Sequence, residues 1–356
     1  MFVHRISLRN FRSYARLELE LPRGLVLVTG RNGVGKTNFL EALHVGSQGF
    51  SQRTRAEPRL VRFGEASARV ALAGAEDGAD FETEVRLAAG EPKRISLNGA
   101  PLASAEELRT RFAALAFTPD RLAVVKGGPI VRRAYIDRML GRLFPGRALL
   151  PTEYGRTLAQ RNAALRRVRA GMSSREALEP WSGRLAELGT QLDRSRAELV
   201  DLLAARFSRQ GETLGLAEPA LAYDERGLTS EELDGRLERD LARGTTSAGP
   251  HLRDLSISAD GRDLRGYGSQ GEQRAAVLGL VLAEAELLAE RRRLPPLLLL
   301  DDVFSELDEE RRAALVAALP PEGQTLVTAT ERGAYPASAP EPAAVLGVIP
   351  GEVRPA

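Results

Sequence analysis

One glycine-rich segment limits the possible folds of this 356-residue chain more than any other feature. Residues 30–37 read Gly-Arg-Asn-Gly-Val-Gly-Lys-Thr and fit the P-loop pattern GxxxxGK[ST]. The continuous apolar run 25–28 before it is typical of a strand buried on both faces, and a helix is expected near 38–45. Glycines let the backbone N–H groups face phosphate oxygens, and the helix adds its positive N-terminal end. The segment therefore predicts an α/β fold that binds a nucleotide.

The P-loop pattern also gives its side chains distinct roles. Lys36 is expected to reach the β- and γ-phosphates of ATP, and Thr37 is expected to ligate Mg²⁺. An ordinary glycine turn at a helix start is the alternative, but chance gives only on the order of 0.003 matches to this pattern. The other residues expected to line the phosphate site are Gly30, Arg31, Asn32, Gly33, Val34, Gly35 and Asn38.

An acidic pair is expected to lie beside the P-loop. The apolar run 297–300 ends at Asp301 and Asp302, so a buried strand would present both carboxylates at its carboxyl end. Asp301 is expected to hold Mg²⁺, directly or through water, as a Walker-B acid. Asp302 is expected to orient or deprotonate the attacking water. Helix capping is the alternative interpretation, because an Asp before Val303 also suits the start of a helix.

A third element, residues 266–273, precedes an apolar helix. Ser269 and Glu272 form an S-x-x-E capping box, which begins many helices. A capped helix start with free N–H groups and a serine hydroxyl is also an anion site. The structural and the functional interpretation are therefore compatible.

Hydrophobic periodicity divides the chain into an α/β core and a helical insertion. Strands are expected at 2–8, 17–21, 25–28, 68–73, 81–87, 94–97, 254–258, 297–300, 325–328 and 344–349, and turns at 77–78 and 98–99. Helices are expected at 38–45, 130–142, 152–170, 174–210 and 270–292. The expected core comprises residues 1–118 plus 245–356, and the mainly helical lobe comprises 119–244. Leucines at heptad-like spacing in 185–202 are interrupted by Ser195, which favours core packing over a long coiled coil.

Composition excludes several other kinds of site. The chain has no cysteine, which excludes disulfides, thiolate metal sites and cysteine catalysis, and its three histidines argue against a multi-histidine metal site. No apolar run reaches the roughly 18 residues that a membrane span needs. The first residues lack the apolar core of a signal peptide. We therefore expect a cytoplasmic protein without a membrane partner.

The order of the motifs resembles the ABC-type ATPases of the SMC class. The P-loop corresponds to Walker A, residues 269–272 to the signature, Asp301-Asp302 to Walker B, and 305–308 to the D-loop. Within this class the chain is similar to the RecF family. Further stretches that carry this similarity are 10–14, 117–120, 125–127, 132–133, 160–162, 249–251 and 267–274.

The resemblance implies an ABC/SMC-type P-loop ATPase head with an antiparallel β subdomain and an inserted helical lobe. It implies a homodimer that forms with ATP, in which Ser269, with Gln270 and Gly271, contacts the γ-phosphate bound to the other subunit. Asp308 would line that interface. Arg12 lies where this class often places a basic residue that contacts the nucleotide.

The resemblance also implies a role and partners. The family takes part in recombinational DNA repair, binds double-stranded DNA next to single-stranded gaps, and works with RecO and RecR to help load the RecA recombinase. The expected activity is a weak, DNA-stimulated ATPase with ATP and Mg²⁺ as cofactors. Most ABC-type ATPases carry Glu where Asp302 stands, and the shorter side chain suggests slow hydrolysis.

The sequence departs from the class pattern in three other places. No switch histidine follows the strand at 325–328, where Thr330 or Glu331 stands, and no Q-loop glutamine is evident, although the turn at 117–120 fits that location. His251 is followed by Leu252 and then Arg253, where the family pattern has arginine directly after the histidine. Neither His251 nor Arg253 is therefore assigned to the site.

Arginines in the helical region are candidates for gripping DNA phosphates without reading bases. They are Arg132, Arg133, Arg138, Arg142, Arg161, Arg166, Arg167 and Arg169. A solvated helix face is an equally good interpretation for any single one. Two other functions stand beside the repair ATPase: the nucleotide-binding subunit of an ABC-type transporter, and an unrelated P-loop kinase.

Overall fold

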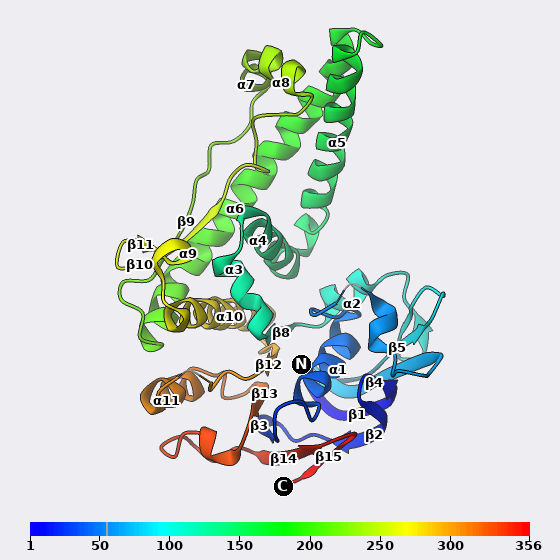
Figure 1. Ribbon diagram of the computed structural model, residues 1–356, viewed down its shortest axis with the longest axis vertical. Helices are drawn as coiled ribbons and strands as arrows, with labels where there is room; N and C mark the ends of the chain where they lie inside the picture. The colour runs from blue at the N-terminus through cyan, green and yellow to red at the C-terminus, as the bar shows by residue number, and fades with distance from the viewer. Residues whose placement is uncertain (55, 306) are drawn as a thin grey trace. The chain divides into compact units, whose positions relative to one another are not determined.

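The computed structural model describes residues 1–54, 56–305 and 307–356, which form two compact units (Figure 1). The first unit comprises Met1–Leu122, Arg209–Ala217 and Ser269–Ala356. The second comprises Ala123–Ser208 and Glu218–Gly268. Both units are built from separated chain segments, so the fold is discontinuous.

A mostly parallel six-stranded sheet forms the centre of the first unit. Its strand order is β15-β14-β3-β13-β12-β8, and only the β14–β15 pair is antiparallel. The strands are β3 (Gly24–Thr29), β8 (Ala114–Phe117), β12 (Leu297–Leu300), β13 (Gln324–Ala329), β14 (Ala344–Ile349) and β15 (Glu352–Pro355). All residues of β8, β12 and β13 are buried, and the sequences of β8 and β12 accordingly read as continuous apolar runs. Their carboxyl ends meet at one edge, where the P-loop follows β3.

A second sheet in the same unit is antiparallel, with the order β2-β1-β4-β5-β6-β7. The strands are β1 (Phe2–Phe11), β2 (Tyr14–Glu20), β4 (Ser67–Glu76), β5 (Ala79–Ala88), β6 (Arg94–Leu97) and β7 (Ala100–Pro101). Polar residues of β5 alternate with buried ones, as expected for a sheet with one solvated face. The turn residues Asp77, Gly78, Asn98 and Gly99 all have positive φ, which confirms both predicted turns.

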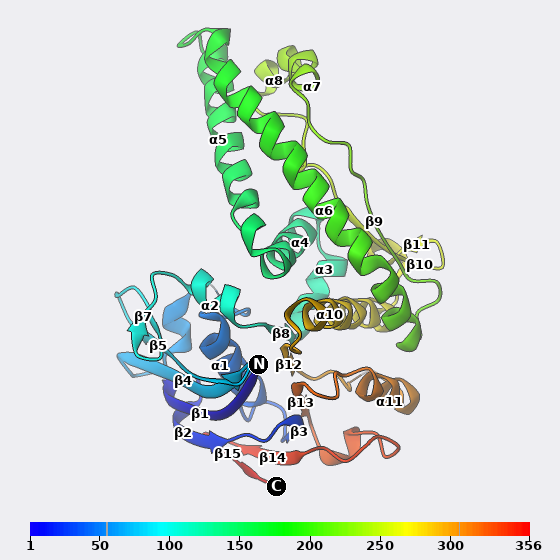
Figure 2. The ribbon, with the colours of Figure 1, turned by 180° about the vertical axis from the view of Figure 1, so that it is seen from behind.

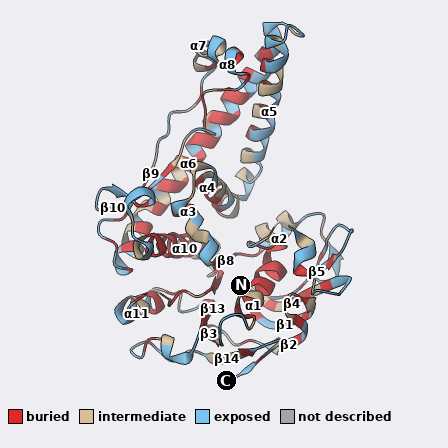
Figure 3. Ribbon diagram, viewed as in Figure 1, coloured by how far each residue is buried: buried red, intermediate tan, exposed pale blue. Residues whose placement is uncertain are grey.

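Helix α1 (Lys36–Gln48) begins in the P-loop and packs against the antiparallel sheet (Figure 2). Gly46 sits where α1 crosses β4, because a Cβ there would lie 2.5 Å from the Leu72 side chain. The other helices of this unit are η1 (Glu57–Leu60), α2 (Ala105–Arg111), η2 (Pro119–Leu122), α10 (Gln270–Arg292), α11 (Glu309–Ala317) and η5 (Arg332–Ala334). Most residues of α1 and α10 are buried (Figure 3).

The second unit is mainly helical. Its helices are α3 (Ala123–Lys126), α4 (Pro129–Leu143), η3 (Pro145–Arg147), α5 (Leu150–Arg169), η4 (Arg175–Leu178), α6 (Glu179–Thr213, whose last five residues belong to the first unit), α7 (Ser230–Gly235), α8 (Leu237–Arg243) and α9 (Leu264–Tyr267). A small sheet, β11-β10-β9, comprises β9 (Ala220–Tyr223), β10 (Leu255–Ala259) and β11 (Arg262–Asp263). The heptad-spaced Leu185, Leu188, Leu192 and Leu199 are buried, in agreement with core packing.

The observed unit boundaries differ from the predicted ones in three places, the smallest being residues 119–122, which lie in the first unit. Residues 245–268 lie in the second unit instead of the core, because β10 pairs with β9 and α9 contacts α3. Residues 209–217 lie in the first unit. None of the described helices is both long and apolar enough to cross a membrane.

Two of the candidate DNA-gripping arginines are buried inside the second unit. The Arg161 side chain is 1% exposed and its Nη1 donates to Asp240 Oδ2 at 2.8 Å and to Thr246 Oγ1 at 2.7 Å. Arg132 donates from Nε to Asp254 Oδ1 at 2.8 Å and is also buried. These two guanidinium groups hold the fold together and do not face solvent, so the expectation that they grip phosphates is wrong for both.

We expect Asp240→Ala to destabilise the protein by about 3–5 kcal/mol, because it leaves the buried Arg161 charge without its carboxylate. Glu238→Ala on the same helix is the matched control. Glu238 pairs with Arg175 in solvent, so the control is expected to cost less than about 1 kcal/mol. Urea denaturation followed by circular dichroism measures both; equal losses for the two variants would contradict the assignment.

Candidate nucleotide and magnesium site

The P-loop takes a shape that only glycine allows at two positions. Gly30 has φ 153° and Gly35 has φ 120°, both in the region that side chains rarely adopt. A Cβ on Gly30 would lie 2.6 Å from the Val348 carbonyl oxygen, and one on Gly35 would lie 2.9 Å from Ser13 Oγ. The loop therefore curls tightly between β3 and the first turn of α1, with the backbone amides of the helix start at its mouth.

Lys36 folds back over this loop. Its Nζ donates to the carbonyl oxygens of Gly30 at 2.5 Å and Arg31 at 3.1 Å, and the residue is buried. Burial lowers the pKa of the Lys36 ammonium, whereas the nearby carboxylates of Asp302 and Asp301 act in the opposite direction. A desolvated cation at a cluster of amides is suited to binding a phosphate.

The segment after β1 supports the loop from the side. The Tyr14 hydroxyl is buried and donates to the Gly35 carbonyl oxygen at 3.0 Å, and Asn38 Nδ2 donates to Ser13 Oγ at 3.1 Å. Burial raises the pKa of Tyr14, so its hydroxyl remains a donor. These contacts fix the position of the helix start relative to the antiparallel sheet.

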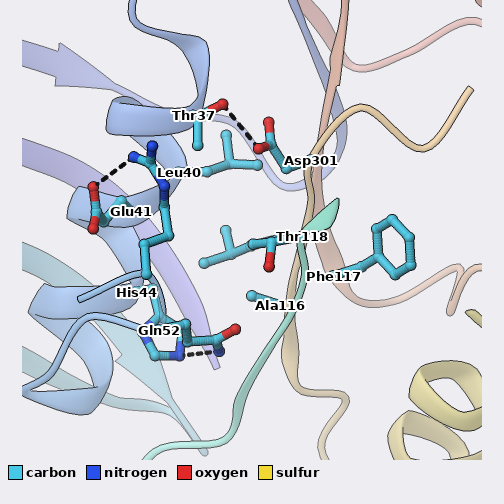
Figure 4. Close-up of a pocket in the computed structure, with 11 residues that line it drawn as sticks. Thr37, Leu40, Glu41, His44, Gln52, Ala116, Phe117, Thr118 and Asp301 are labelled. Carbon is cyan, nitrogen blue, oxygen red and sulfur yellow. Dashed lines mark hydrogen bonds and ion pairs between the residues drawn. The ribbon is translucent and has the colours of Figure 1, made fainter. Parts of the chain in front are cut away.

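Asp301 connects the P-loop to two strands. Its Oδ2 accepts from Thr37 Oγ1 at 2.8 Å (Figure 4). Its Oδ1 accepts from Thr328 Oγ1 at 2.8 Å. Its backbone N–H donates to the Phe117 carbonyl oxygen at 2.9 Å. Burial raises the pKa of Asp301, and the two hydroxyl donors oppose that shift. Thr37 and Asp301 are hard oxygen donors, which is the chemistry that Mg²⁺ requires, and they fit the predicted metal role.

Across the described parts of the chain, no cluster of three or more His, Cys, Asp or Glu residues is placed to hold a metal ion. A magnesium ion at Thr37 and Asp301 would therefore depend on phosphate oxygens and water for its other ligands. That is the usual arrangement for magnesium in nucleotide sites.

Asp302 adopts an unusual backbone conformation, with φ 52°. Its N–H donates to Thr328 Oγ1 at 2.8 Å, and its Oδ2 accepts from Ser305 Oγ at 2.9 Å. Its carbonyl oxygen accepts from Arg274, whose Nη2 also donates to Ser305 Oγ at 3.0 Å. The side chain is thus held beside the P-loop by α10 and by the segment after β12.

The signature-like element begins α10. Ser269 is the N-cap residue: its Oγ accepts from Glu272 N at 3.2 Å, and its N–H donates to Glu272 Oε2 at 2.7 Å. This confirms the capping box, and both Ser269 and Gln270 are exposed. Asp308, also exposed, caps α11 by accepting from Arg311 N at 2.8 Å. Within the D-loop stretch Glu306 lies outside the described residues.

Arg12 contacts α1 through Glu41. Arg12 Nε and Nη2 donate to the two Glu41 carboxylate oxygens at 2.9 and 2.8 Å, and Arg53 Nη1 donates to the same carboxylate at 3.0 Å. Glu41 is one turn beyond Thr37 and its side chain is only 3% exposed. The structure therefore places Arg12 on the flank of the P-loop helix, held by a buried acid.

A small cavity adjoins this cluster, lined by Thr37, Glu41, His44, Gln52, Thr118 and Asp301 among others (Figure 4). Gln52 forms a hydrogen bond to His44 Nε2 at 2.5 Å, and its Oε1 accepts from Arg121 Nε at 3.2 Å. Thr118, from the turn considered for the Q-loop, lines the same cavity. Gln52 is the glutamine that lines this cavity. Nothing in its local sequence distinguishes it from the other glutamines of the chain.

Other residues missed or left open by the sequence can now be placed. Thr328 contacts both aspartates and was recognised only as part of a strand, whereas Thr330 and Glu331, considered for the switch, are exposed. His251 belongs to the second unit, where its Nδ1 forms a hydrogen bond to the Tyr154 hydroxyl at 2.6 Å. Arg274 belongs to the stretch 267–274 that carries the family similarity, and no separate role is expected for it from the sequence.

Comparisons with known proteins show which family this chain resembles. The family described as RecF/RecN/SMC N terminal domain matches residues 2–348. The chain is 35% identical to the DNA replication and repair protein RecF of Halothermothrix orenii over 350 residues, which cover 93% of this chain and 92% of the relative. It is 37% identical to the RecF of Myxococcus xanthus, covering 92% and 90%.

Solved structures show the same fold. The recombination mediator protein RecF with ATP, in the RecFOR pathway, superposes with a TM-score of 0.86 at 29% identity, covering 100% of this chain and 97% of that one. An SMC head bound to the C-terminal winged-helix domain of ScpA superposes with a TM-score of 0.61 at 16% identity, covering 100% and 98%. The predicted fold class is confirmed.

We expect Asp301→Asn to leave the nucleotide-free protein as stable or to raise its melting temperature by about 2 °C, because the carboxylate is buried. Because the pKa of Asp301 is raised in the folded protein, its ionisation lowers the stability at pH values above its pKa in the unfolded chain. The amide of asparagine removes that cost. The same variant should lose the increase in melting temperature that ATP with Mg²⁺ gives the wild type.

Asp120→Asn, at an exposed carboxylate beyond β8, is the control and should keep the increase in full. Differential scanning fluorimetry with and without ATP and Mg²⁺ tests all three proteins. A full nucleotide-dependent shift in Asp301→Asn would remove Asp301 from the metal site.

Proposed function

We propose a function for this chain because it belongs to the RecF family, within the group described as the RecF/RecN/SMC N terminal domain. The chain is a DNA replication and repair protein with the head of an SMC-type ATPase. It acts as an ATP-switched protein of recombinational repair. The observation that carries the proposal is the joint Thr37–Asp301–Thr328 contact beside Lys36, which assembles both halves of an ATPase site.

ATP with Mg²⁺ is the proposed ligand pair of this site. The P-loop residues 30–38 cradle the phosphates, Lys36 neutralises their charge, and Thr37 with Asp301 holds the metal. When bound there, Mg²⁺ would supply positive charge that offsets the negative charge of the phosphates. Asp302 takes the proton of the attacking water or orients it, because its carboxylate lies beside Lys36 and is held by Ser305.

The exposed start of α10 supports the proposal of an ATP-dependent homodimer. Ser269, Gln270 and Gly271 present a capped helix terminus to solvent, at the end of a 23-residue helix. In the dimer these residues contact the γ-phosphate bound to the other subunit, with Asp308 at the same interface. Arg274, on the second turn of this helix, contacts Asp302 and links the terminus to the hydrolytic site of its own chain.

DNA and repair proteins are the proposed partners. The solved RecF relatives are described as part of the RecFOR pathway, which supports RecO and RecR as partners and RecA loading as the outcome. We propose binding to double-stranded DNA beside single-stranded gaps. The transporter subunit remains the alternative function, and it predicts a membrane partner and no response to DNA.

We expect saturating ATP and Mg²⁺ to convert the wild type from monomer to dimer in sedimentation velocity. Ser269→Arg should stay monomeric while it still binds ATP, because the bulky cation blocks the helix terminus at the interface. Ser230→Arg, at the exposed start of α7 in the other unit, is the matched control and should dimerise. A wild type that stays monomeric with ATP, alone and with gapped DNA, would refute the dimer.

We expect slow release of phosphate from ATP, accelerated by double-stranded DNA. Asp302→Asn should reduce the rate by about 10²-fold or more while ATP binding persists, because general-base assistance is lost. Glu331→Gln, at an exposed acid beyond β13, should behave as the wild type. A coupled phosphate assay measures both rates; transfer to an acceptor instead of water would favour a kinase, and no DNA response would favour the transporter.

A further inference from the structure

Five arginines lie directly opposite one another across the antiparallel sheet. Paired Cα partners run from Arg16 on β2 to Arg9 on β1, to Arg69 on β4, to Arg86 on β5 and to Arg94 on β6. We call this row the arginine ladder. Strands lie about 4.8 Å apart, so four steps span about 19 Å. The strands lie side by side in both ribbon views (Figures 1 and 2).

Like charges directly opposite each other in a sheet are destabilising. Three carboxylates offset part of the repulsion: Glu84 pairs with Arg69 and Arg86, Glu18 with Arg16, and Glu91 with Arg94. Arg9 forms no ion pair with any residue that the structure describes. The row as a whole holds five cations, and three acids pair with them. Sheet stability alone therefore gives no reason for this row.

The ladder is open to solvent. The side chains of Arg16, Arg94 and Arg86 are 81%, 78% and 64% exposed, and that of Arg69 is 39% exposed. Arg9 is exposed as well. Of the candidate arginines in the helical unit, Arg132 and Arg161 are buried in ion pairs, whereas others, such as those near the end of α5, are exposed. The antiparallel sheet thus offers a second exposed set of guanidinium groups, aligned by strand register.

The neighbouring row on the same face combines two acids with three small side chains. Its paired residues are Glu18, Ser7, Ala71, Glu84 and Ser96. All residues of this row and of the ladder are described, and none of them is aromatic. Proteins that bind single strands stack bases on aromatic side chains, whereas contacts to duplex come mainly from cations that meet phosphates. The composition of this face favours a duplex backbone.

We propose that the arginine ladder binds the phosphate backbone of double-stranded DNA. The inference rests on the proposed function, because it presupposes that the chain binds DNA. Guanidinium forks match phosphate oxygens in geometry and in charge. A duplex carries one phosphate per strand for each 3.4 Å of axis, so about 19 Å presents five or six per strand. Phosphates replace Glu84 as the partners of Arg69 and Arg86 when DNA binds.

The test is the affinity for a blunt duplex, and for a single strand of the same sequence, measured by fluorescence anisotropy across a salt series. The triple variant Arg9→Gln, Arg86→Gln, Arg94→Gln removes three ladder cations. The comparison variant Arg166→Gln, Arg167→Gln, Arg169→Gln removes three exposed cations of α5. Because both variants lose three positive charges, their comparison separates a local contact with DNA from general electrostatic attraction. Unchanged melting temperature and ATP binding verify that each variant is folded.

We expect the ladder variant to bind duplex at least about tenfold more weakly than both the wild type and the α5 variant. Its slope of log K against log salt should be less steep by about 2.7, since three phosphate contacts are lost at about 0.9 each. Glu84→Gln should tighten duplex binding a few-fold, because it frees Arg69 and Arg86, whereas Glu187→Gln on α6 should not.

Wild-type affinity and slope in the ladder variant would overturn the inference, and so would a loss confined to the single strand. If the wild type binds duplex and only the α5 variant is weakened, the proposed repair function stands and the ladder is not its contact surface. If the wild type binds no DNA with or without ATP, the proposed function itself fails, and the ladder inference falls with it.

Discussion

The carboxylate of Asp301 is the contact on which the rest of the site depends. It accepts one hydroxyl from the P-loop helix and one from β13, so a single buried side chain fixes three elements that are separate in sequence. Burial raises its pKa and makes the isolated anion costly, which the two hydroxyl donors partly offset. A buried carboxylate of this kind is suited to accept a cation.

The residues after Asp301 extend this arrangement away from the phosphates. Asp302 turns the backbone through a positive φ, and its carbonyl oxygen and side chain are held by Arg274 and Ser305. Arg274 lies on the helix that Ser269 caps, so the exposed helix terminus is connected to the Asp302 backbone through one side chain. The contacts between the terminus and Asp302 are therefore short and physically continuous.

The sequence was sufficient to predict the elements with strong periodicity and the motif residues, because local patterns determine both. The α10 helix and the β12 strand were predicted with their observed bounds. The β8 strand was missed because four apolar residues alone suit a helix as well as a strand, whereas the equally short β12 is marked by the prolines before it and the acidic pair after it. Thr328, Gln52 and Glu41 act through partners 27 to 69 residues away, so only the fold reveals them. The arginine ladder depends on strand register, which a single sequence does not specify.

The distance along the chain between Thr37 and Asp301 also governs when their contact can form during synthesis. They are 264 residues apart, and at 5–20 residues per second the ribosome needs about 13–53 s to reach the second after the first. Throughout that interval the P-loop is present without Asp301 and without β12 and β13, which complete its sheet. The contact between Thr37 and Asp301 therefore forms only late in synthesis, after the helical unit between them has been made.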